Sequence, residues 1–483
     1  MHSYLVNVTR QWQLHEHMCF NGTVRKAAWK GDNQWSIHRN QDTEAGNSEA
    51  YTITCSYLIS TVGQLHTSCV PDIPGFKEYR GKVMHTTNWD EDEKLEGRRV
   101  TVIGNGATGV QVVPEVTSYA KQLTVFQRYP SWIIPRDSQP LSELQQILYQ
   151  YVPPARRYYR SQILKDQDSR QGMVVNERVR EMGAQFSKDF LARQLPLDPD
   201  LRARWTPPYP FGCKRVLLSD DFYPAIGKAH VSLETRPIEC ITKNGVQVEN
   251  TEMPFDLLIF ATGFRAQSFL SHIDMTGKNE RHISSDWRHG LCAHQGVTVE
   301  NLANSAMLYG PDTNLNHVSV MLMIEAQARY ISAMVRVVQE AAKVGSSLTI
   351  CPKIQAVAHY NDALQGRLNK TVFAESGCRS WYRAKDGVVT NNWPGTAIEY
   401  QKNLSVLNWD EYDMVGSDFS SLVKRGTQSL GGPLENSPAS VLAFLAWVTQ
   451  IAVRFLGLCK MSPSQARFPW HTKDKYKLSH SNN

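Results

Sequence analysis

The stretch Arg99-Val-Thr-Val-Ile-Gly104-Asn-Gly106-Ala-Thr-Gly109 determines the fold that this sequence predicts. It reads as a buried β-strand, then a tight turn, then the start of a helix. In this pattern Gly104 permits the turn, Gly106 leaves room for a pyrophosphate, and Gly109 lets the helix pack close to the strand. The helix N-terminus presents free N–H groups and a positive dipole end to the phosphates. The other residues of the predicted cofactor-binding turn are Asn105, Ala107 and Thr108.

The residues after the next strand indicate which dinucleotide binds. A lone GxGxxG has little weight, but here a strand precedes it and a second strand, Leu123–Phe126, follows it. At the end of that second strand an NAD site would carry Asp or Glu, whereas this chain has Gln127-Arg128. An arginine at this position suits the 2′-phosphate of NADP(H). The alternative is a turn of the same shape that binds no ligand.

Composition describes an ordinary globular protein. The chain has 483 residues, enough for two or three domains, of which 41% are hydrophobic and 20% charged. The net charge of +6 is mild for this length, and no cluster of Lys and Arg marks a nucleic-acid surface. The nine cysteines are scattered without a CxxC pair, which argues against a disulfide framework or a metal site and favours a reducing, cytoplasmic location.

Hydrophobic spacing predicts the main elements. Residues 23–29 and 34–38 alternate like antiparallel strands, and 255–263 reads as a buried strand with a small-residue end. Residues 142–204 have helical spacing, and 318–343 reads as one long amphipathic helix.

The segment 441–458 is nearly continuous in apolar residues. A spanning helix needs about 20 of them, and Gln450 and Arg454 interrupt this run. Three interpretations remain open: a packed helix, an interfacial helix in peripheral contact with a membrane, and a tail anchor.

Several motifs resemble one family. Residues 79–90, Tyr-Arg-Gly-Lys-Val-Met-His-Thr-Thr-Asn-Trp-Asp, resemble the fingerprint F-x-G-x-x-x-H-x-x-x-W-P/D of Baeyer–Villiger monooxygenases, with Tyr79 in place of Phe. Further similar blocks follow in the family's order over roughly residues 5–405. They are 125–132, 211–223, 256–264, 309–313, 323–327, 380–382 and 392–395.

The resemblance implies an α/β fold with two Rossmann-like nucleotide-binding domains and a helical insertion. The NADP domain is expected to be complete and the FAD domain to lack its N-terminal part, because the family's first glycine fingerprint has no counterpart here. The implied division is 1–95 and 266–410 for the FAD domain, 96–140 and 206–265 for the NADP domain, 141–205 for the insertion and 411–483 for a C-terminal extension.

The family reaction inserts one oxygen atom of O2 beside a ketone and gives an ester or lactone. In it NADPH reduces FAD, the flavin adds O2, and the resulting peroxyflavin attacks the carbonyl. By its position in the block 211–223, Arg215 resembles the arginine that stabilises the developing negative charge. Without that resemblance Arg215 would read as a salt-bridged arginine at the start of a strand.

The remaining site residues are also assigned by resemblance. Lys214 would join Arg128 at the 2′-phosphate of NADP, and Tyr129 stands where relatives often carry Thr. Thr262 and Gly263 belong to the family's ATG motif and are expected at a cofactor.

Gly81, His85 and Trp89 form the fingerprint, for which we expect a structural and gating part; a satisfied buried histidine is the alternative for His85. Trp381 lies in a segment that resembles the mobile loop over substrate and NADP, where water must be excluded; a core tryptophan is the alternative. Asn316 replaces a glycine of relatives, in a turn that asparagine tolerates.

Three candidate functions remain. The first is implied by the resemblance, since the length and motif set look like those of fungal FAD-binding monooxygenases: Baeyer–Villiger oxidation of a polycyclic aromatic ketone in secondary metabolism of the polyketide or mycotoxin type. The second is oxygenation of nitrogen or sulfur by a related flavin enzyme, which the Trp89-Asp90 ending disfavours. The third is a non-catalytic NADP-binding remnant.

Overall fold

The computed structural model describes residues 2–42, 48–136, 139–287, 290–378, 380–384, 386–416 and 426–430. It divides the chain into two compact units. The first contains residues 1–140 and 164–432, and the second contains 141–163 and 433–483, of which only 141–163 are described. The apolar segment 441–458 lies outside the described residues.

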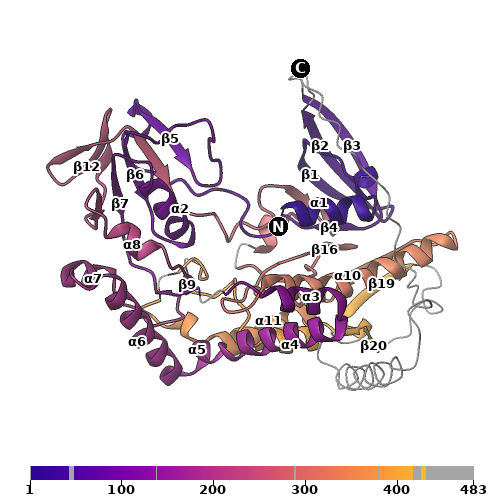
Figure 1. Ribbon diagram of the computed structural model, residues 1–483. Coiled ribbons are helices and arrows are strands. Elements are labelled where there is room, and N and C mark those ends of the chain that lie inside the picture. Colours follow the sequence, from indigo (N-terminus) through magenta and orange to yellow (C-terminus); the bar gives the residue numbers. More distant parts are fainter. Residues whose placement is uncertain are drawn as a thin grey trace, which may run out of the picture. The chain divides into compact units, whose positions relative to one another are not determined.

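A five-stranded parallel sheet is built around the glycine turn (Figure 1). Its strands stand in the order β10-β7-β6-β14-β5. Their bounds are Val231–Glu234, Gln122–Phe126, Arg99–Ile103, Leu257–Phe260 and Lys82–His85, respectively. Both faces of the central strands are covered, so β6 and β14 are almost entirely buried, as continuous apolar runs predict.

Two helices pack on this sheet within the first unit. Helices α2 (Ala107–Thr117) and α8 (Phe222–Ile226) contribute Val113, Val116, Phe222 and others to one apolar cluster with the sheet. Because all five strands are parallel, the segments that follow them meet at one edge of the sheet.

The other sheets are smaller. The strands β15 (Asp274–Thr276), β1 (Gly22–Lys30), β2 (Gln34–Asp42) and β3 (Ser48–Cys55) form a sheet in that order, antiparallel except for β15 beside β1. The predicted antiparallel strands 23–29 and 34–38 are therefore confirmed. A three-stranded antiparallel sheet and four strand pairs are the other sheets of the described residues. Their strands are β11 (Cys240–Ile241), β12 (Gly245–Val248) and β13 (Thr251–Pro254), and the pairs β4 (Leu58–Ser60) with β16 (Ser305–Met307), β8 (Ile133–Ile134) with β9 (Leu217–Leu218), β17 (Leu348–Pro352) with β19 (Tyr412–Gly416), and β18 (Val406–Asn408) with β20 (Thr427–Ser429).

Helix α10 (Val320–Lys343) is the long amphipathic helix that the sequence predicts. Its buried side chains, which include Met323, Tyr330 and Met334, recur at helical spacing and join the largest apolar cluster among the described residues. The remaining helices are α1 (His2–Gln11), α3 (Glu143–Tyr151), α4 (Pro153–Ser169), α5 (Gly172–Val175), α6 (Glu177–Gln194), α7 (Pro199–Trp205), α9 (Ile283–Asp286), α11 (Ile354–Leu368) and α12 (Ala397–Asn403), with 3₁₀ turns at Leu14–His17, Phe76–Glu78, Lys278–Glu280, Val372–Ala374 and Trp409–Glu411. The helical character of 142–204 is thus confirmed.

The described helices include none with the length and apolar character to cross a membrane. The predicted domain boundaries stay a prediction. One strand is notable in this respect, because β5 lies in the stretch assigned to the FAD domain but pairs with β14 in the nucleotide sheet.

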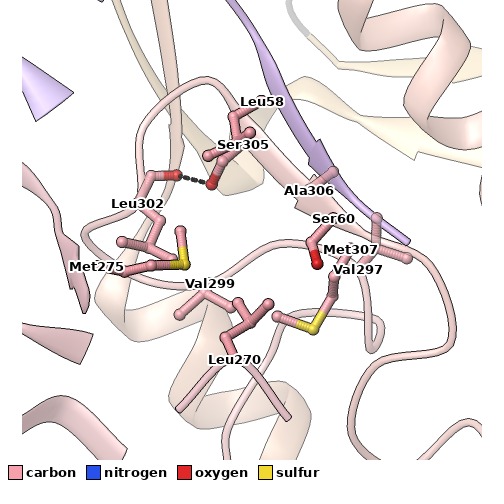
Figure 2. A pocket seen from close by; sticks show the side chains of 10 residues that line it. All are labelled: Leu58, Ser60, Leu270, Met275, Val297, Val299, Leu302, Ser305, Ala306 and Met307. Carbon is pink, nitrogen blue, oxygen red and sulfur yellow. Dashed lines mark hydrogen bonds between the residues drawn. The ribbon is translucent and has the colours of Figure 1, made fainter. Parts of the chain in front are cut away.

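A small cavity lies beside the parallel pair β4 and β16 (Figure 2). Its volume of about 10 Å³ is close to that of a single water site. The walls are apolar apart from Ser60 and Ser305, and the Ser305 hydroxyl donates to the Leu302 carbonyl at 2.9 Å. A space of this size and polarity is a packing defect and not a ligand site.

Candidate functional site

The glycine turn has the geometry that the sequence predicts. Gly104 has a φ of 107°, and a Cβ there would lie 2.7 Å from the Ala261 carbonyl oxygen. A Cβ at Gly109 would overlap the Gly104 carbonyl oxygen. A Cβ at Gly106, by contrast, would meet no described atom within 4 Å. The turn is therefore closed toward the protein at Gly104 and Gly109 and open at Gly106, in front of helix α2.

Asn105 secures this turn from inside the protein. Its side-chain amide donates to Gln127 at 2.8 Å, and Gln127 in turn donates to the Arg204 carbonyl at 2.9 Å. Asn105 and Gln127 are both buried. These bonds hold the segments after β6 and β7 together, so the Asn105 side chain supports the turn and its amide is already partnered.

Two cations gather beside the turn. Arg128 is exposed after β7, and Lys214 lies close enough for the Arg128 charge to act on it. Burial, and then the neighbouring Arg128 charge, lowers the pKa of Lys214 to about 8. The Lys214 ammonium lies over the rings of Tyr209 and Tyr129, at 4.3 and 5.1 Å from their centroids. Within the described part of the chain neither cation has a carboxylate partner, which makes the pair suited to an anionic ligand.

The fingerprint residues lie at the carboxyl edge of the same five-stranded sheet. His85 ends β5, and its Nε2 is 3.4 Å from the Thr262 hydroxyl after β14. That hydroxyl donates to the Cys69 carbonyl at 2.5 Å. Burial lowers the pKa of His85, which favours its neutral form. These contacts connect the end of β5, the residues after β14 and the loop that contains Cys69, which agrees with a structural role of the fingerprint.

The other predicted residues near this edge differ in their surroundings. A side chain at Gly81 would overlap the Tyr79 hydroxyl, which donates to the Phe255 carbonyl at 3.0 Å. Trp89 is 39% exposed. Gly263 has a φ of 79° and open space where a Cβ would lie.

A second polar region lies where β4 and β16 end. These strands are parallel, so the residues after them meet, and segment 390–393 lies beside them through the parallel bridge of Asn314 with Asn392. The Asn314 amide donates to Asn392 at 2.9 Å and accepts from the Tyr309 hydroxyl at 2.6 Å. Gln64 accepts from Asn391. We call these residues, together with Asp312, Asn316, Tyr382 and Thr390, the polar network.

The polar network contains buried atoms without partners among the described residues. They are Asp312 Oδ1, Asn316 Nδ2, Thr390 Oγ1, Asn391 Oδ1 and Asn392 Nδ2. Burial raises the pKa of Asp312 well above its ordinary value, which favours the neutral form of this carboxyl. An unsatisfied buried polar atom costs about 1–3 kcal/mol. The network therefore fits a polar ligand that supplies the missing hydrogen bonds.

Arg215 adjoins the polar network. Burial is the largest influence on the pKa of Tyr309, raising it to about 12, and the Arg215 charge acts in the opposite direction. The pKa of Tyr382 is likewise raised overall by burial, and the Arg215 charge opposes this shift. The Tyr382 hydroxyl donates to Asn316 at 2.6 Å. Arg215 itself is exposed and forms no ion pair with a described carboxylate. The salt-bridged arginine considered as the alternative is thus not observed among these residues.

Comparison with known proteins gives the family. The model of the family described as flavin-binding monooxygenase-like matches residues 1–280. The chain is 39% identical to the FAD-binding monooxygenase ktnD of Aspergillus niger over 444 residues, which are 91% of this chain and 73% of that protein. It is 31% identical to a Baeyer–Villiger monooxygenase of Streptomyces coelicolor, over 86% of this chain and 78% of that one.

The chain belongs to the flavin-binding monooxygenase-like family. This membership confirms the predicted resemblance and the predicted class of enzyme, a flavin-dependent monooxygenase, with FAD and NADP as the cofactors of that class.

Solved structures confirm the α/β fold with FAD and NADP domains. A complex of OTEMO with FAD and NADP superposes with a TM-score of 0.73 at 23% identity, over 86% of this chain and 84% of that one. Cyclohexanone monooxygenase from Rhodococcus bound to NADP⁺ gives a TM-score of 0.72 at 24% identity, over 85% and 83%.

Several residues of this candidate site carry little or no signal in the sequence. Gln64, Asn314 and Tyr382 form hydrogen bonds of the polar network. Of these three, only Tyr382 falls in a block that resembles the family, as does its neighbour Tyr309. Gln267 carries no sequence signal either. Its amide donates to the Trp381 carbonyl at 3.5 Å and to the Arg383 carbonyl, so it anchors the loop that carries Trp381, a residue 41% exposed.

Proposed function

We propose that this protein is a Baeyer–Villiger monooxygenase that uses NADPH, FAD and O2 to insert oxygen beside a ketone. The observation that carries the proposal is the position of Arg215, an exposed guanidinium without a carboxylate partner among the described residues, beside the unsatisfied polar network. Relatives named Baeyer–Villiger monooxygenase at 30–31% identity support it.

The residues at the glycine turn fit NADPH. Gly106 leaves the approach to the α2 N-terminus open, where free N–H groups suit a pyrophosphate. Arg128 and Lys214 supply two positive charges for a 2′-phosphate. Tyr129, which replaces the threonine of relatives, contributes its ring beneath the Lys214 ammonium.

The polar network fits the flavin of FAD. Its unpartnered donors and acceptors match a ring edge that carries both C=O and N–H groups. When bound, the flavin supplies the redox chemistry and the activation of O2. Asn316 belongs to this set through its Nδ2, which has no partner among the residues described, and its Oδ1 accepts from Tyr382.

Arg215 stabilises negative charge on oxygen during the insertion. Its guanidinium stays protonated at every working pH, and its rigid donors need no reorganisation as charge develops. Lys214 and Arg215 are adjacent in sequence but act in different places. Lys214 lies over Tyr129 and Tyr209, whereas Arg215 acts on Tyr309 and Tyr382.

Trp381 and the fingerprint complete the proposed site. The loop of Trp381 excludes water from the reacting oxygen, which matters because water diverts the oxygen to H2O2. Gly81, His85 and Trp89 keep their predicted structural and gating part, and Thr262 and Gly263 stay assigned to cofactor binding.

For the substrate we propose a polycyclic aromatic ketone of fungal polyketide metabolism. The similarity to fungal monooxygenases such as ktnD of Aspergillus niger and tazF of Aspergillus terreus supports this choice.

The test is Arg215→Ala, with Arg215→Lys as the variant that keeps the charge and loses the fork. Purified protein is loaded with FAD, and anaerobic flavin reduction by NADPH and ester formation from a panel of ketones are measured separately. We expect Arg215→Ala to lose ester formation while flavin reduction stays within about twofold. Loss of reduction as well would assign Arg215 to cofactor binding. Oxygenated amines or sulfides without any ester would support the second predicted function, and failure to take up FAD the third.

A further inference from the structure

A disulfide joins two segments of the proposed active site. Cys213 and Cys378 are 165 residues apart in sequence, their Cα atoms lie 5.6 Å apart, and both are buried. The scattered cysteines predict no disulfide framework and favour a reducing environment. The Cys213–Cys378 bond is not predicted by that pattern, and it departs from the reducing environment, in which such bonds are rare.

The first cysteine belongs to the block of Arg215. Cys213 follows Gly212, whose φ is 82°, and stands two residues before Arg215. The block runs beside the linker 130–134, since the Leu217 N–H donates to the Trp132 carbonyl at 2.9 Å. One end of the disulfide is therefore fixed to a strand pair within the core.

The second cysteine belongs to the loop of Trp381. Cys378 precedes Trp381 by three residues. In its described part the loop is also held by hydrogen bonds: the Tyr382 hydroxyl donates to Asn316 at 2.6 Å, and the Tyr382 carbonyl accepts from the Thr390 N–H at 3.0 Å. Glu375 pairs with Arg180 of α6 at 3.1 Å, and Gln267 holds the carbonyls of Trp381 and Arg383. The disulfide adds a covalent bond between this loop and the block of Arg215.

We propose that the Cys213–Cys378 disulfide is a positioning element that keeps the loop of Trp381, through Tyr382, beside the segment of Arg215, so that oxygen insertion outcompetes release of H2O2. Tyr382 carries the argument, because its hydroxyl bonds Asn316 of the polar network while Arg215 acts on it from the other segment. The part of this inference that concerns catalysis rests on the proposed function.

Reduction breaks the link in a defined way. Two electrons and two protons from a dithiol such as dithiothreitol convert the disulfide into the thiols of Cys213 and Cys378, and the dithiol becomes a cyclic disulfide. Since both cysteines are buried, the reductant reaches them only when the loop opens, so reduction is slow.

The first measurement does not need catalysis. Unreduced protein is digested under denaturing, thiol-blocking conditions and analysed by mass spectrometry. We expect one cross-linked peptide pair containing Cys213 and Cys378, and two fewer titratable thiols than after reduction. Absence of this pair overturns the proposal.

The second measurement compares the wild type with the double variant Cys213→Ala/Cys378→Ala. We expect amide hydrogen exchange in peptides spanning 376–384 to become about tenfold faster, the change for an opening equilibrium shifted by about 1.4 kcal/mol. The share of NADPH consumed as H2O2 should rise, with KM for the ketone increased. Cys292→Ala, at an exposed free cysteine, is the control and should change none of these.

If the double variant does not fold, the same measurements are made on the folded wild type after reduction of its disulfide. Dithiothreitol should reproduce the faster exchange in the wild type and add nothing in the double variant. Unchanged exchange and unchanged H2O2 release after loss of the bond would overturn the proposal. If the wild type makes no ester from any ketone, the proposed function fails, and hydrogen exchange and H2O2 release from NADPH alone still decide this inference.

Discussion

Removal of one charge at the glycine turn tests the cofactor assignment most directly. Arg128 follows β7 at the carboxyl edge of the nucleotide sheet, and its guanidinium lies 5.9 Å from the centroid of the Tyr129 ring. Together with Lys214 it forms the positive pair assigned to the 2′-phosphate of NADPH. NADH lacks this phosphate, so Arg128→Ala should act on NADPH alone.

The expected magnitude follows from exposure and charge. A hydrogen bond to a charged group contributes about 1.5–3 kcal/mol, and the exposure of Arg128 lowers this to about 1–2 kcal/mol by screening. Since 1.4 kcal/mol is a factor of about ten, the preference for NADPH over NADH should fall by about 5- to 30-fold. Part of the loss is offset, because removing the Arg128 charge also raises the pKa of Lys214 and keeps it protonated.

The assay is anaerobic flavin reduction at pH 7.5 and low salt, with NADPH and NADH titrated separately. Arg98→Ala is the matched control: it removes the same charge beside the same sheet, but before β6, where Arg98 pairs with Glu93 at 2.7 Å. Equal weakening of NADPH and NADH by Arg128→Ala, or equal use of the two by the wild type, would refute the assignment.

Three further predictions concern the same edge of the sheet. Because the folded-state pKa of Lys214 is lowered to about 8, its charge is lost as pH rises through this value, so the Kd for NADPH should increase between about pH 8 and 9, and Lys214→Arg should remove that dependence. Gly104→Ala should lower the free energy of unfolding by about 1–3 kcal/mol, because of its φ of 107° and the close Ala261 carbonyl; a thermal midpoint equal to that of the wild type would contradict this. Gly106→Ala should leave the thermal midpoint within about 2 °C, since a Cβ meets nothing there, but weaken NADPH binding measured by titration; unchanged binding would place the pyrophosphate elsewhere.

Local chemistry made part of this structure predictable. The strand, turn and helix at 99–117 follow from an apolar run and three glycines, and α10 follows from apolar spacing over 24 residues. The antiparallel strands β1 and β2 were visible for the same reason, since alternation over a few residues reflects one covered face of a sheet.

Long-range pairing set the limits of that prediction. Gln64 and Asn391 bond across 327 positions, and Cys213 reaches Cys378 across 165. No residue near Gln64 signals its partner, because a single polar side chain has no periodicity. The assignments of Arg215, Lys214 and Trp381 came from resemblance, and neither composition nor spacing placed them near one another.

The sequence by itself determined the nucleotide-binding turn and its open position at Gly106, because steric freedom at glycine and strand burial are properties of neighbouring residues. Only the tertiary structure decided what surrounds Arg215. Parallel pairing brings the ends of β4 and β16 together, and the disulfide carries the Trp381 loop to the Arg215 block. These contacts form when segments distant in sequence pack into one core, so the residues next to each partner do not predict them.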